Sequence, residues 1–279
     1  GNMLTSLVYV VMSIMGSIPY QAPGCSHKCH RHHNKEHLLK YVCRLASDRR
    51  YVKHEELTLA HTNDTIALTE MDFINCDMSE FPFESLSYVF QLRTLFLSYN
   101  HLTHIPDRLG YLGNLERLIV SDNKIHYIEP NAFRELPNLQ LINLENNHIA
   151  TLGLNSLYFR IEETNELEVI LYNNGIATIK DALAGSMPTR LDLSRTKIST
   201  LEEEVFRPLL QHMLQHRTHD LGLLFELDLQ GTPLKCDCRI DWLVNGSPEL
   251  IEAIKDGMCE DNETSLANLT NIDTWSANC

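Results

Sequence analysis

Cysteine and histidine side chains crowd into one short stretch near the start of the chain. The run CSHKCHRHHNKEH begins at Cys25 and contains two cysteines and five histidines. Thiolate and imidazole groups are ligands that Zn²⁺ and Cu²⁺ accept in proteins. The spacing matches no closed Cys/His zinc site, so metal binding is the less favoured interpretation. Its candidate ligands are His27, His30, His32 and His33.

Disulfide bonding is the favoured interpretation of the same stretch. In an oxidising compartment the thiols of Cys25, Cys29 and Cys43 would pair with one another, and the histidines would be solvated. Three cysteines leave one that pairs with Cys76, stays free or reaches another chain. If Cys76 is the fourth, three connectivities are compatible with the sequence. We therefore expect a disulfide-stabilised N-terminal cap and no cofactor.

Several weak signals together predict an extracellular protein. The stretch LTSLVYVVMSIMGSI favours a signal peptide over residues 1–22, with a buried N-terminal element as the alternative. Eight cysteines are typical of secreted proteins. No later stretch is long and apolar enough to span a membrane, so the mature chain is expected to lack a span. Four Asn-x-Ser/Thr sequons predict N-glycosylation, at Asn63, Asn245, Asn262 and Asn268.

The charge of the chain limits its partners. The formal net charge is −14 at neutral pH, which would repel the phosphates of nucleic acids and of anionic membranes. A protein with a basic surface is the easier complement. The sequence contains no G-x-S-x-G, no phosphate-binding glycine loop and no paired-carboxylate motif, so we expect no enzymatic activity.

A fixed rhythm of aliphatic residues organises the middle of the chain. In LRTLFLSYNHL, which starts at Leu92, apolar residues stand at steps 0, 3, 5 and 10 and an asparagine stands at step 8. The pattern returns at Leu115 and Leu139, and looser copies precede and follow these units. The step-8 residues are Cys76, Asn100, Asn123, Asn147, Asn174, Thr196 and Thr232.

A spacing of about 24 residues with this consensus indicates leucine-rich repeats. Steps 3 and 5 alternate on a short strand and face the core, and neighbouring strands form a parallel sheet. Step 8 lies in a turn where buried backbone groups need a polar partner, which asparagine supplies. The expected fold is an α/β solenoid, or horseshoe, with a parallel concave sheet, short helices or turns on the convex face and disulfide-stabilised caps.

The predicted domain limits follow from the repeats. An N-terminal cap is expected over residues 23–65, about seven repeats over 66–234 and a cysteine-rich C-terminal cap over 235–279. Caps are needed because an open stack exposes its core at both ends.

The C-terminal part also resembles known proteins. The stretch PLKCDCRIDWLV, followed by two later cysteines, resembles the C-terminal cap of extracellular leucine-rich repeat proteins. That resemblance implies the pairs Cys236–Cys259 and Cys238–Cys279. The segments MPTRLDLSRTKISTLEEEVFRPLLQ and LFELDLQGTPLKCDCRIDWLV further resemble a group of secreted arthropod repeat proteins, the family of the oplophorus-type luciferase non-catalytic subunit. The resemblance implies a secreted repeat subunit that performs no chemistry itself.

The residues between the core positions are the candidates for function. Steps 2, 4 and 6 are expected to point out of the concave face. They predict an apolar centre with a polar and acidic rim, the anatomy of a protein interface. The candidate partner-binding residues are Phe96, Arg117, Ile119, Leu141, Ile170, Tyr172, Asp192 and Asp228. We expect a non-enzymatic protein-binding module, with N-terminal metal binding or service as a non-catalytic enzyme subunit as alternatives.

Overall fold

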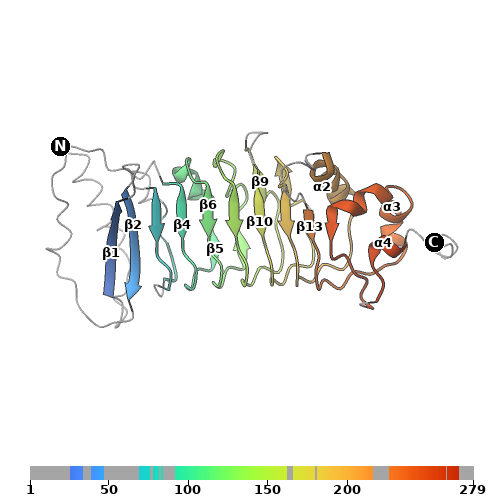
Figure 1. Cartoon of the computed structure of the whole chain (residues 1–279), viewed down its shortest axis with the longest axis horizontal. Helices are drawn as coiled ribbons and strands as arrows, with labels where there is room; N and C mark the ends of the chain where they lie inside the picture. Colours follow the sequence, from blue (N-terminus) through green and yellow to red (C-terminus); the bar gives the residue numbers. More distant parts are fainter. Residues whose placement is uncertain are drawn as a thin grey trace.

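The computed structural model describes residues 26–33, 39–46, 69–75, 78–81, 83, 92–161, 166–179, 181–215, 226–261 and 263–269. In this part of the chain each repeat contributes one short strand to a common sheet, and the strands lie side by side along the long axis of the molecule (Figure 1). The predicted repeat solenoid is confirmed.

The common sheet is parallel throughout and, within the described residues, has eight strands. Their spatial order is β14-β13-β12-β10-β8-β6-β4-β3, so consecutive repeats are always neighbours. The strands are β3 (Glu70–Asp72), β4 (Thr94–Phe96), β6 (Arg117–Ile119), β8 (Leu141–Asn143), β10 (Glu168–Ile170), β12 (Arg190–Asp192), β13 (Glu226–Asp228) and β14 (Ile254–Lys255).

The apolar rhythm of the sequence produces the core. In the repeat that begins at Leu115, the side chains at steps 0, 3, 5 and 10 are fully buried. The strand residues on either side of step 3 are half-buried or exposed, because successive side chains of a strand point to opposite faces. The core is therefore a continuous column of aliphatic side chains behind the sheet.

Buried asparagines join each repeat to the one before it. The side chain of Asn123 is 5% exposed, and its Oδ1 accepts a hydrogen bond from the backbone N–H of Leu102 at 3.0 Å. Its Nδ2 donates to the carbonyls of Leu97, Val120 and Ser121. Asn147 repeats this arrangement one unit later. The amide thus satisfies backbone groups that no ladder reaches.

The residue before each of these polar positions turns the chain sharply. Every described step-7 residue has a positive φ, a conformation that glycine adopts easily and asparagine or aspartate tolerates. Tyr99 and Arg195 adopt it as well, at φ 59° and 52°. The full set is Asn75, Tyr99, Asp122, Asn146, Asn173, Arg195 and Gly231. Five of the seven are asparagine, aspartate or glycine, so the sequence carried a signal for this turn that the leucine rhythm alone does not include.

The side of the solenoid away from the sheet is built from short, varied pieces. β5 (His104–Ile105) pairs with β7 (Tyr127–Ile128), and β9 (Leu157–Phe159) pairs with β11 (Leu183–Gly185). A 3₁₀ helix, η3 (Asp107–Leu112), follows β5. α2 (Glu203–Gln215) is the longest described helix and buries Phe206, Leu209, Leu210 and Met213. The expected short helices and turns on the convex side are therefore present.

The two ends of the stack differ. At the N-terminal end, β1 (Ser26–His33) and β2 (Leu39–Ala46) form an antiparallel hairpin beside β3 (Figure 1). At the C-terminal end, η4 (Cys238–Ile240), α3 (Asp241–Val244), η5 (Pro248–Ala253) and α4 (Leu266–Leu269) cover the last repeats. The last sheet strand, β14, comes from the segment that the sequence pattern assigns to the cap.

The C-terminal cap is held by a disulfide and by its tryptophan. Cys236 and Cys259 are disulfide-bonded with their Cα atoms 5.5 Å apart, and this is the pair that the cap resemblance implies. Cys238 is also disulfide-bonded. Its predicted partner, Cys279, lies outside the described residues, so that pairing stays a prediction. The indole Nε1 of Trp242 donates to the carbonyl of Leu201 at 2.9 Å, which fixes the cap to the entrance of α2.

None of the helices in the described ranges has the length and apolar character needed to cross a membrane.

Substitution of the asparagine at position 123 tests the link between repeats. We expect Asn123→Ala to lower the free energy of unfolding by about 2–4 kcal/mol, because several buried backbone groups lose their partner. Asn123→Thr is the matched variant, since Thr196 and Thr232 occupy the same step and donate to Leu193 and Leu229. It should lose less. Urea unfolding measures both, and equal stability of the two variants would contradict the role assigned to the amide.

Candidate protein-binding face

The predicted apolar residues gather on the open face of the sheet, here called the concave face. Phe96 of β4 lies in register with Ile119 of β6, and Ile170 of β10 follows two strands later in the same row. Leu141 of β8 lies in the adjacent row. All four side chains are half-buried rather than exposed, as expected where cross-strand neighbours on one face of a sheet shield one another. The structure thus brings the predicted centre together on four consecutive strands.

Tyr172 follows β10, two residues after Ile170, and is half-buried. Its ring is covered by the guanidinium of Arg195, whose Cζ lies 5.5 Å from the ring centroid. A cation over an aromatic face is attracted by the ring quadrupole, so the arginine holds the ring in place. Sequence reasoning missed Arg195, because its step-7 position carries no consensus.

The step-6 side chains do not join this face as expected. Ser98 and Ser121 are 4% and 6% exposed, and their hydroxyls are 2.8 Å apart in a hydrogen bond. Ser194 is 3% exposed. The prediction that step 6 points to solvent is wrong for these serines, because the chain is already turning inward there.

Charged residues at the C-terminal half of the concave face neutralise one another. Arg190 of β12 lies between Glu168 and Glu226, with N–O distances of 2.9 and 3.6 Å. Lys255 of β14 lies 2.7 Å from Asp228 and 3.8 Å from Glu226. The expected acidic rim is therefore a row of alternating charges over four strands.

Asp192 and Asp228 also stabilise the fold through hydrogen bonds, a role that the sequence did not reveal. Asp192 accepts hydrogen bonds from the backbone N–H of Ser194 at 2.9 Å and from its hydroxyl. Asp228 accepts from the N–H of Gln230 at 3.0 Å and from Lys255, and is 5% exposed. A partner can reach Asp192, which is half-buried, more easily than Asp228.

Lys255 belongs to this face, and the sequence rhythm could not find it. Its strand lies beyond the last repeat, and no leucine pattern marks it. The hydrogen bond from its ammonium to Asp228 raises the pKa of Lys255 above its ordinary value, with the charges of Asp228 and Glu226 acting in the same direction. The cap thus supplies the cation that neutralises the end of the sheet.

The remaining predicted residues lie at the edge of this face, away from it or outside the described residues. Arg117 is exposed on β6, at the edge of the apolar centre. Asn245 and Asn268 are exposed on the C-terminal cap. The backbone of β1 carries His27, His30, His32 and His33, and Cys29 lies opposite Cys43 in the β1–β2 register. Outside the described residues lie the predicted signal peptide, Cys25, Asn63, Cys76, Asn262 and Cys279.

Within the described part of the chain, no three or more histidine, cysteine, aspartate or glutamate side chains are grouped so that they could hold a metal ion. The metal interpretation of the N-terminal run is untested by this finding, because Cys25 and His37 lie outside that part.

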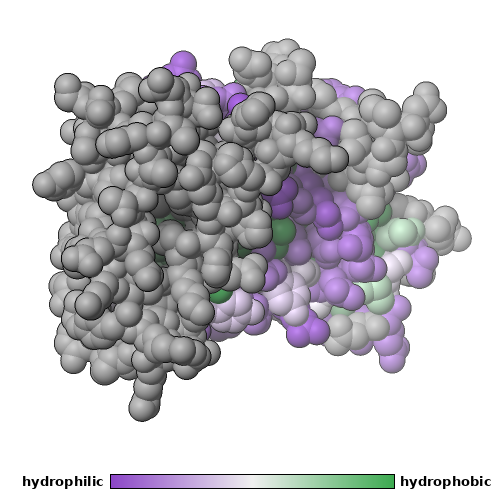
Figure 2. Space-filling model, turned by 60° about the vertical axis from the view of Figure 1, so that its left-hand side comes forward, coloured by the Kyte–Doolittle hydropathy of each residue, from purple (hydrophilic) through white to green (hydrophobic). Residues whose placement is uncertain are grey.

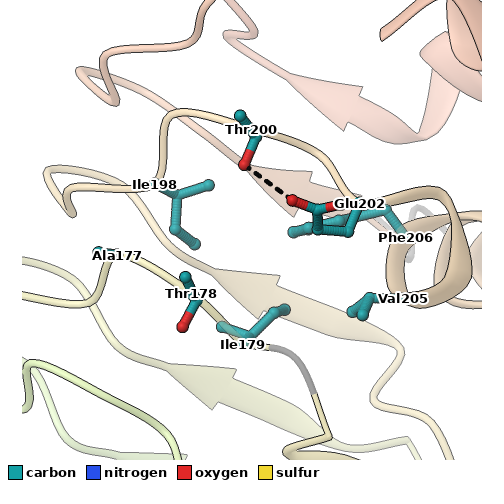
Figure 3. A pocket seen from close by; sticks show the side chains of 8 residues that line it. All are labelled: Ala177, Thr178, Ile179, Ile198, Thr200, Glu202, Val205 and Phe206. Carbon is teal, nitrogen blue, oxygen red and sulfur yellow. Dashed lines mark hydrogen bonds between the residues drawn. The ribbon is translucent and has the colours of Figure 1, made fainter. Parts of the chain in front are cut away.

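One apolar depression lies on the convex side, before α2 (Figure 3). Its empty space of about 240 Å³ includes open solvent, so it is smaller and shallower than a typical ligand pocket. Its polar groups include the carboxylate of Glu202, which accepts a hydrogen bond from the hydroxyl of Thr200 at 3.2 Å. The lining residues are Ala177, Thr178, Ile179, Ile198, Thr200, Glu202, Val205 and Phe206.

In space-filling representation, hydrophilic residues predominate in the coloured part of the face in view, with a few hydrophobic residues among them (Figure 2). Apolar groups with polar ones around them are characteristic of protein interfaces, whereas an enclosed apolar cavity is characteristic of small-molecule sites. The half-buried apolar centre of the concave face, with charged residues beside it, is of the first kind.

Comparison with known proteins agrees with the fold. Residues 90–149 match the leucine rich repeat family. The match covers part of the chain, and the fold of the chain is that of a leucine-rich repeat solenoid. It is 26% identical over 210 residues to the oplophorus-luciferin 2-monooxygenase non-catalytic subunit of Oplophorus gracilirostris, covering 67% of this chain and 55% of that protein. It is 32% identical over 125 residues to mouse podocan, covering 44% of this chain and 20% of podocan.

Other repeat proteins also match this leucine-rich repeat chain. Rat leucine-rich repeat transmembrane protein FLRT2 is 26% identical over 165 residues, which cover 54% of this chain and 24% of FLRT2. A structure of the Toll–Spatzle complex of Drosophila aligns with 71% of this chain and 31% of that chain, at 22% identity and a TM-score of 0.46. The repeat-family match, the non-catalytic luciferase subunit and podocan support a non-enzymatic protein-interaction module. The chain spans about half the length of the luciferase subunit and less of the other relatives.

Removal of the lysine at position 255 tests the charge row. We expect Lys255→Met to lower the free energy of unfolding by about 1 kcal/mol near neutral pH, a modest loss because the lysine side chain is 44% exposed and its charge is screened. The folded-state pKa is raised, so this stabilisation is complete below about pH 10 and disappears as the pH rises through that higher value. Lys197→Met, an exposed lysine at step 9, is the control. The idea fails if the difference between wild type and Lys255→Met is independent of pH up to 12.

Proposed function

We propose that this protein is a secreted, non-catalytic binding module that recognises a protein partner through its concave face. The observation that carries the proposal is the half-buried apolar centre of Phe96, Ile119, Leu141 and Ile170, with Tyr172 beside it. Large aromatic and aliphatic side chains at the middle of a polar surface dominate the binding energy of protein interfaces. Side chains that are already held by their neighbours also lose little conformational entropy on binding.

The paired charges of the concave face limit where a partner can bind and which charged groups it can contact. Because Glu168, Glu226 and Asp228 are paired with Arg190 and Lys255, the C-terminal half offers few charges that a partner could use. The charged groups that a partner can contact are then the exposed Arg117 and Asp192, which lie beside the apolar centre. The partner would place an apolar side chain on β4 to β10 and a basic group near Asp192, which agrees with the acidic character of the whole chain.

A second candidate function follows from one relative. The name of the Oplophorus protein describes a non-catalytic subunit of a monooxygenase. By analogy the partner of this chain would be an extracellular enzyme that needs a repeat protein for its stability or presentation. The same face would carry that interaction, so the two candidates differ only in whether the bound partner has catalytic activity.

A double substitution on the concave face tests the proposal. The full chain is used as bait in the extracellular fluid of its source, beside Phe96→Ala, Tyr172→Ala. We expect the wild type to retain a protein that the variant loses or binds at least about tenfold more weakly, because two central aromatic anchors are gone. Tyr111→Ala removes an aromatic ring that is 54% exposed on η3 and serves as the matched control. Mass spectrometry of the retained protein and an assay of its activity separate the two candidates.

Equal retention by wild type and by the concave-face variant would contradict the proposed site, provided that circular dichroism shows both to be folded. A partner lost from both the concave-face variant and Tyr111→Ala would also contradict it, because the contact would not be specific to the sheet.

Secretion of the protein predicts N-linked glycans on the C-terminal cap. Asn245 and Asn268 are exposed on the cap and lie away from the concave face, so glycans there would leave partner binding unchanged. We expect Asn245→Gln and Asn268→Gln each to remove one enzyme-releasable glycan, seen as a step in electrophoretic mobility of the secreted chain. Retention of the chain inside expressing cells without any glycan would count against an extracellular address.

A further inference from the structure

The N-terminal hairpin brings two cysteines from different strands to the same position. β1 and β2 pair in antiparallel register, and Cys29 of β1 lies directly opposite Cys43 of β2. The hairpin lies beside β3, at the end of the solenoid where the repeat stack begins (Figure 1). The register therefore bears on how the N-terminal cysteines are paired, which the sequence alone leaves open.

The distance between directly opposite residues of an antiparallel pair suits a disulfide. Their Cα atoms are about 4.5 Å apart in a non-hydrogen-bonded pair and about 5.5 Å apart in a hydrogen-bonded pair. A disulfide joins Cα atoms that are about 4.4–6.8 Å apart. Both kinds of pair lie within that range, so the backbone of the hairpin needs no rearrangement to join Cys29 to Cys43. In the C-terminal cap, the Cα atoms of the bonded Cys236 and Cys259 are 5.5 Å apart.

Among the cysteines in the described ranges, Cys43 is the one that is placed to pair with Cys29. The described cysteines of the C-terminal cap are already disulfide-bonded, and the cap lies at the opposite end of the solenoid (Figure 1). Cys25 immediately precedes β1, whose first residue, Ser26, is three residues from Cys29, or roughly 10 Å along an extended strand. A bond between Cys25 and Cys29 would therefore require the chain to reverse its direction just before β1.

The cysteine pair belongs to the more apolar face of the hairpin. Successive residues of a strand belong to opposite faces, so the register divides the hairpin into two sets of residues. On β2, leucine and tyrosine share the face of Cys43, whereas Lys40 and Arg44 belong to the other face. We call the first set the cysteine face: His27, Cys29, Arg31, His33, Leu39, Tyr41, Cys43 and Leu45.

A covalent link would stabilise this hairpin in particular. A two-stranded hairpin is marginally stable by itself, and an open repeat stack needs a stable cap because its core is exposed at the end. A bond between Cys29 and Cys43 closes a loop of roughly 15 residues around the hairpin turn. Such a loop restricts the unfolded chain, and disulfides stabilise small elements mainly in this way.

The same alternation argues against a metal site built from the N-terminal histidines. His27 and His33 belong to the cysteine face, whereas His30 and His32 belong to the opposite face. Ligand atoms of a zinc ion lie about 2.0–2.3 Å from the metal, so residues of opposite faces cannot share one ion. His27 and His33 are six residues apart, or roughly 20 Å along the strand, and cannot share one either. The two strands therefore offer no set of four ligands.

We propose that Cys29 and Cys43 form a cross-strand disulfide that covalently closes the N-terminal hairpin. As the sulfur–sulfur bond forms, the two thiols lose two electrons and two protons. The electrons pass to the disulfide of a thiol oxidoreductase, which takes up two protons and becomes a dithiol. Enzymes of this class act in oxidising compartments, so the inference rests on the secreted state in the proposed function and not on the concave face.

The proposed bond also limits the pairing of the remaining N-terminal cysteines. If Cys76 is the fourth cysteine of this group, three connectivities are compatible with the sequence. The one that contains the bond between Cys29 and Cys43 joins Cys25 to Cys76. Cys25 and Cys76 lie outside the described residues, so this second bond is a consequence to be measured.

Peptide mapping of the secreted full chain without reduction tests the pair. Free thiols are alkylated first, so that no thiol–disulfide exchange follows. Trypsin cleaves after lysine and arginine and places the three cysteines in separate peptides: Cys25 in one that ends at Lys28, Cys29 in CHR (29–31) and Cys43 in YVCR (41–44). We expect mass spectrometry to find CHR joined to YVCR, two hydrogen atoms lighter than the sum of both peptides, and to find the two peptides separately after reduction.

Two results would overturn the proposal. One is CHR joined to a peptide that contains Cys25 or Cys76. The other is alkylation of both Cys29 and Cys43 in a secreted chain that circular dichroism shows to be folded. Elemental analysis of the same sample then distinguishes free thiols from a zinc site, because a site formed by these thiolates would retain about one zinc ion per chain.

Serine variants provide an independent thiol count after unfolding without reduction. Under the proposal, Cys29→Ser and Cys43→Ser each have one more reactive thiol than the wild type, whereas the double variant has the same number. Two free cysteines would instead give one fewer in each single variant and two fewer in the double variant. Cys25→Ser is the matched control and should retain the linked peptides.

The concave-face variant separates this inference from the proposed binding site. Phe96→Ala, Tyr172→Ala should show CHR joined to YVCR as the wild type does, because its substitutions lie on other elements. A failure of partner binding through the concave face would therefore leave the peptide map unchanged. Loss of the linked peptides in the wild type would overturn the disulfide and leave the concave-face test unaffected.

Discussion

The hydrogen bonds of one buried amide per repeat hold the solenoid together. Each asparagine accepts from the N–H of the preceding repeat and donates to carbonyls of both repeats, as Asn100, Asn123, Asn147 and Asn174 show. Without it, the turn that leaves each strand would bury several unpaired backbone groups. The strand spacing, the positive-φ turns and the rows of side chains on the concave face all depend on this contact.

At the C-terminal end of the solenoid, other contacts take the place of the asparagine amide. Thr196 and Thr232 donate only within their own repeats, so the amide link to the preceding unit is missing there. α2, the disulfide between Cys236 and Cys259, and the cap supply the alternative. Arg207 of α2 lies 5.2 Å from the ring centroid of Trp242 and donates to Ser247, which ties the helix to the cap. Lys255 lies on β14, the strand that the cap contributes to the sheet, and pairs with the carboxylates on the concave face.

The repeat geometry also explains why one chain can offer two unlike surfaces. Strand residues at steps 2 and 4 form the concave face, and the residues that follow the asparagine turn form a separate flank of the solenoid. Each position recurs on every repeat, so a preference for one residue type at a position produces a row of similar side chains along the solenoid. On the concave face the bias is apolar in the centre and charged toward the C-terminus, and on the flank it is histidine and tyrosine near the N-terminus.

The repeat fold, the core positions and the membership of Phe96, Ile119, Leu141 and Ile170 in one surface were predictable from the sequence alone. These properties follow from local periodicity, because the period of a strand and the length of a repeat determine which side chains face the core. The pairing of Asp228 with Lys255, the burial of Ser98 and Ser121 and the stacking of Arg195 on Tyr172 were decided only by the tertiary structure. Each joins residues of different units, or of the cap and a repeat, and periodicity carries no information about contacts between positions without a consensus.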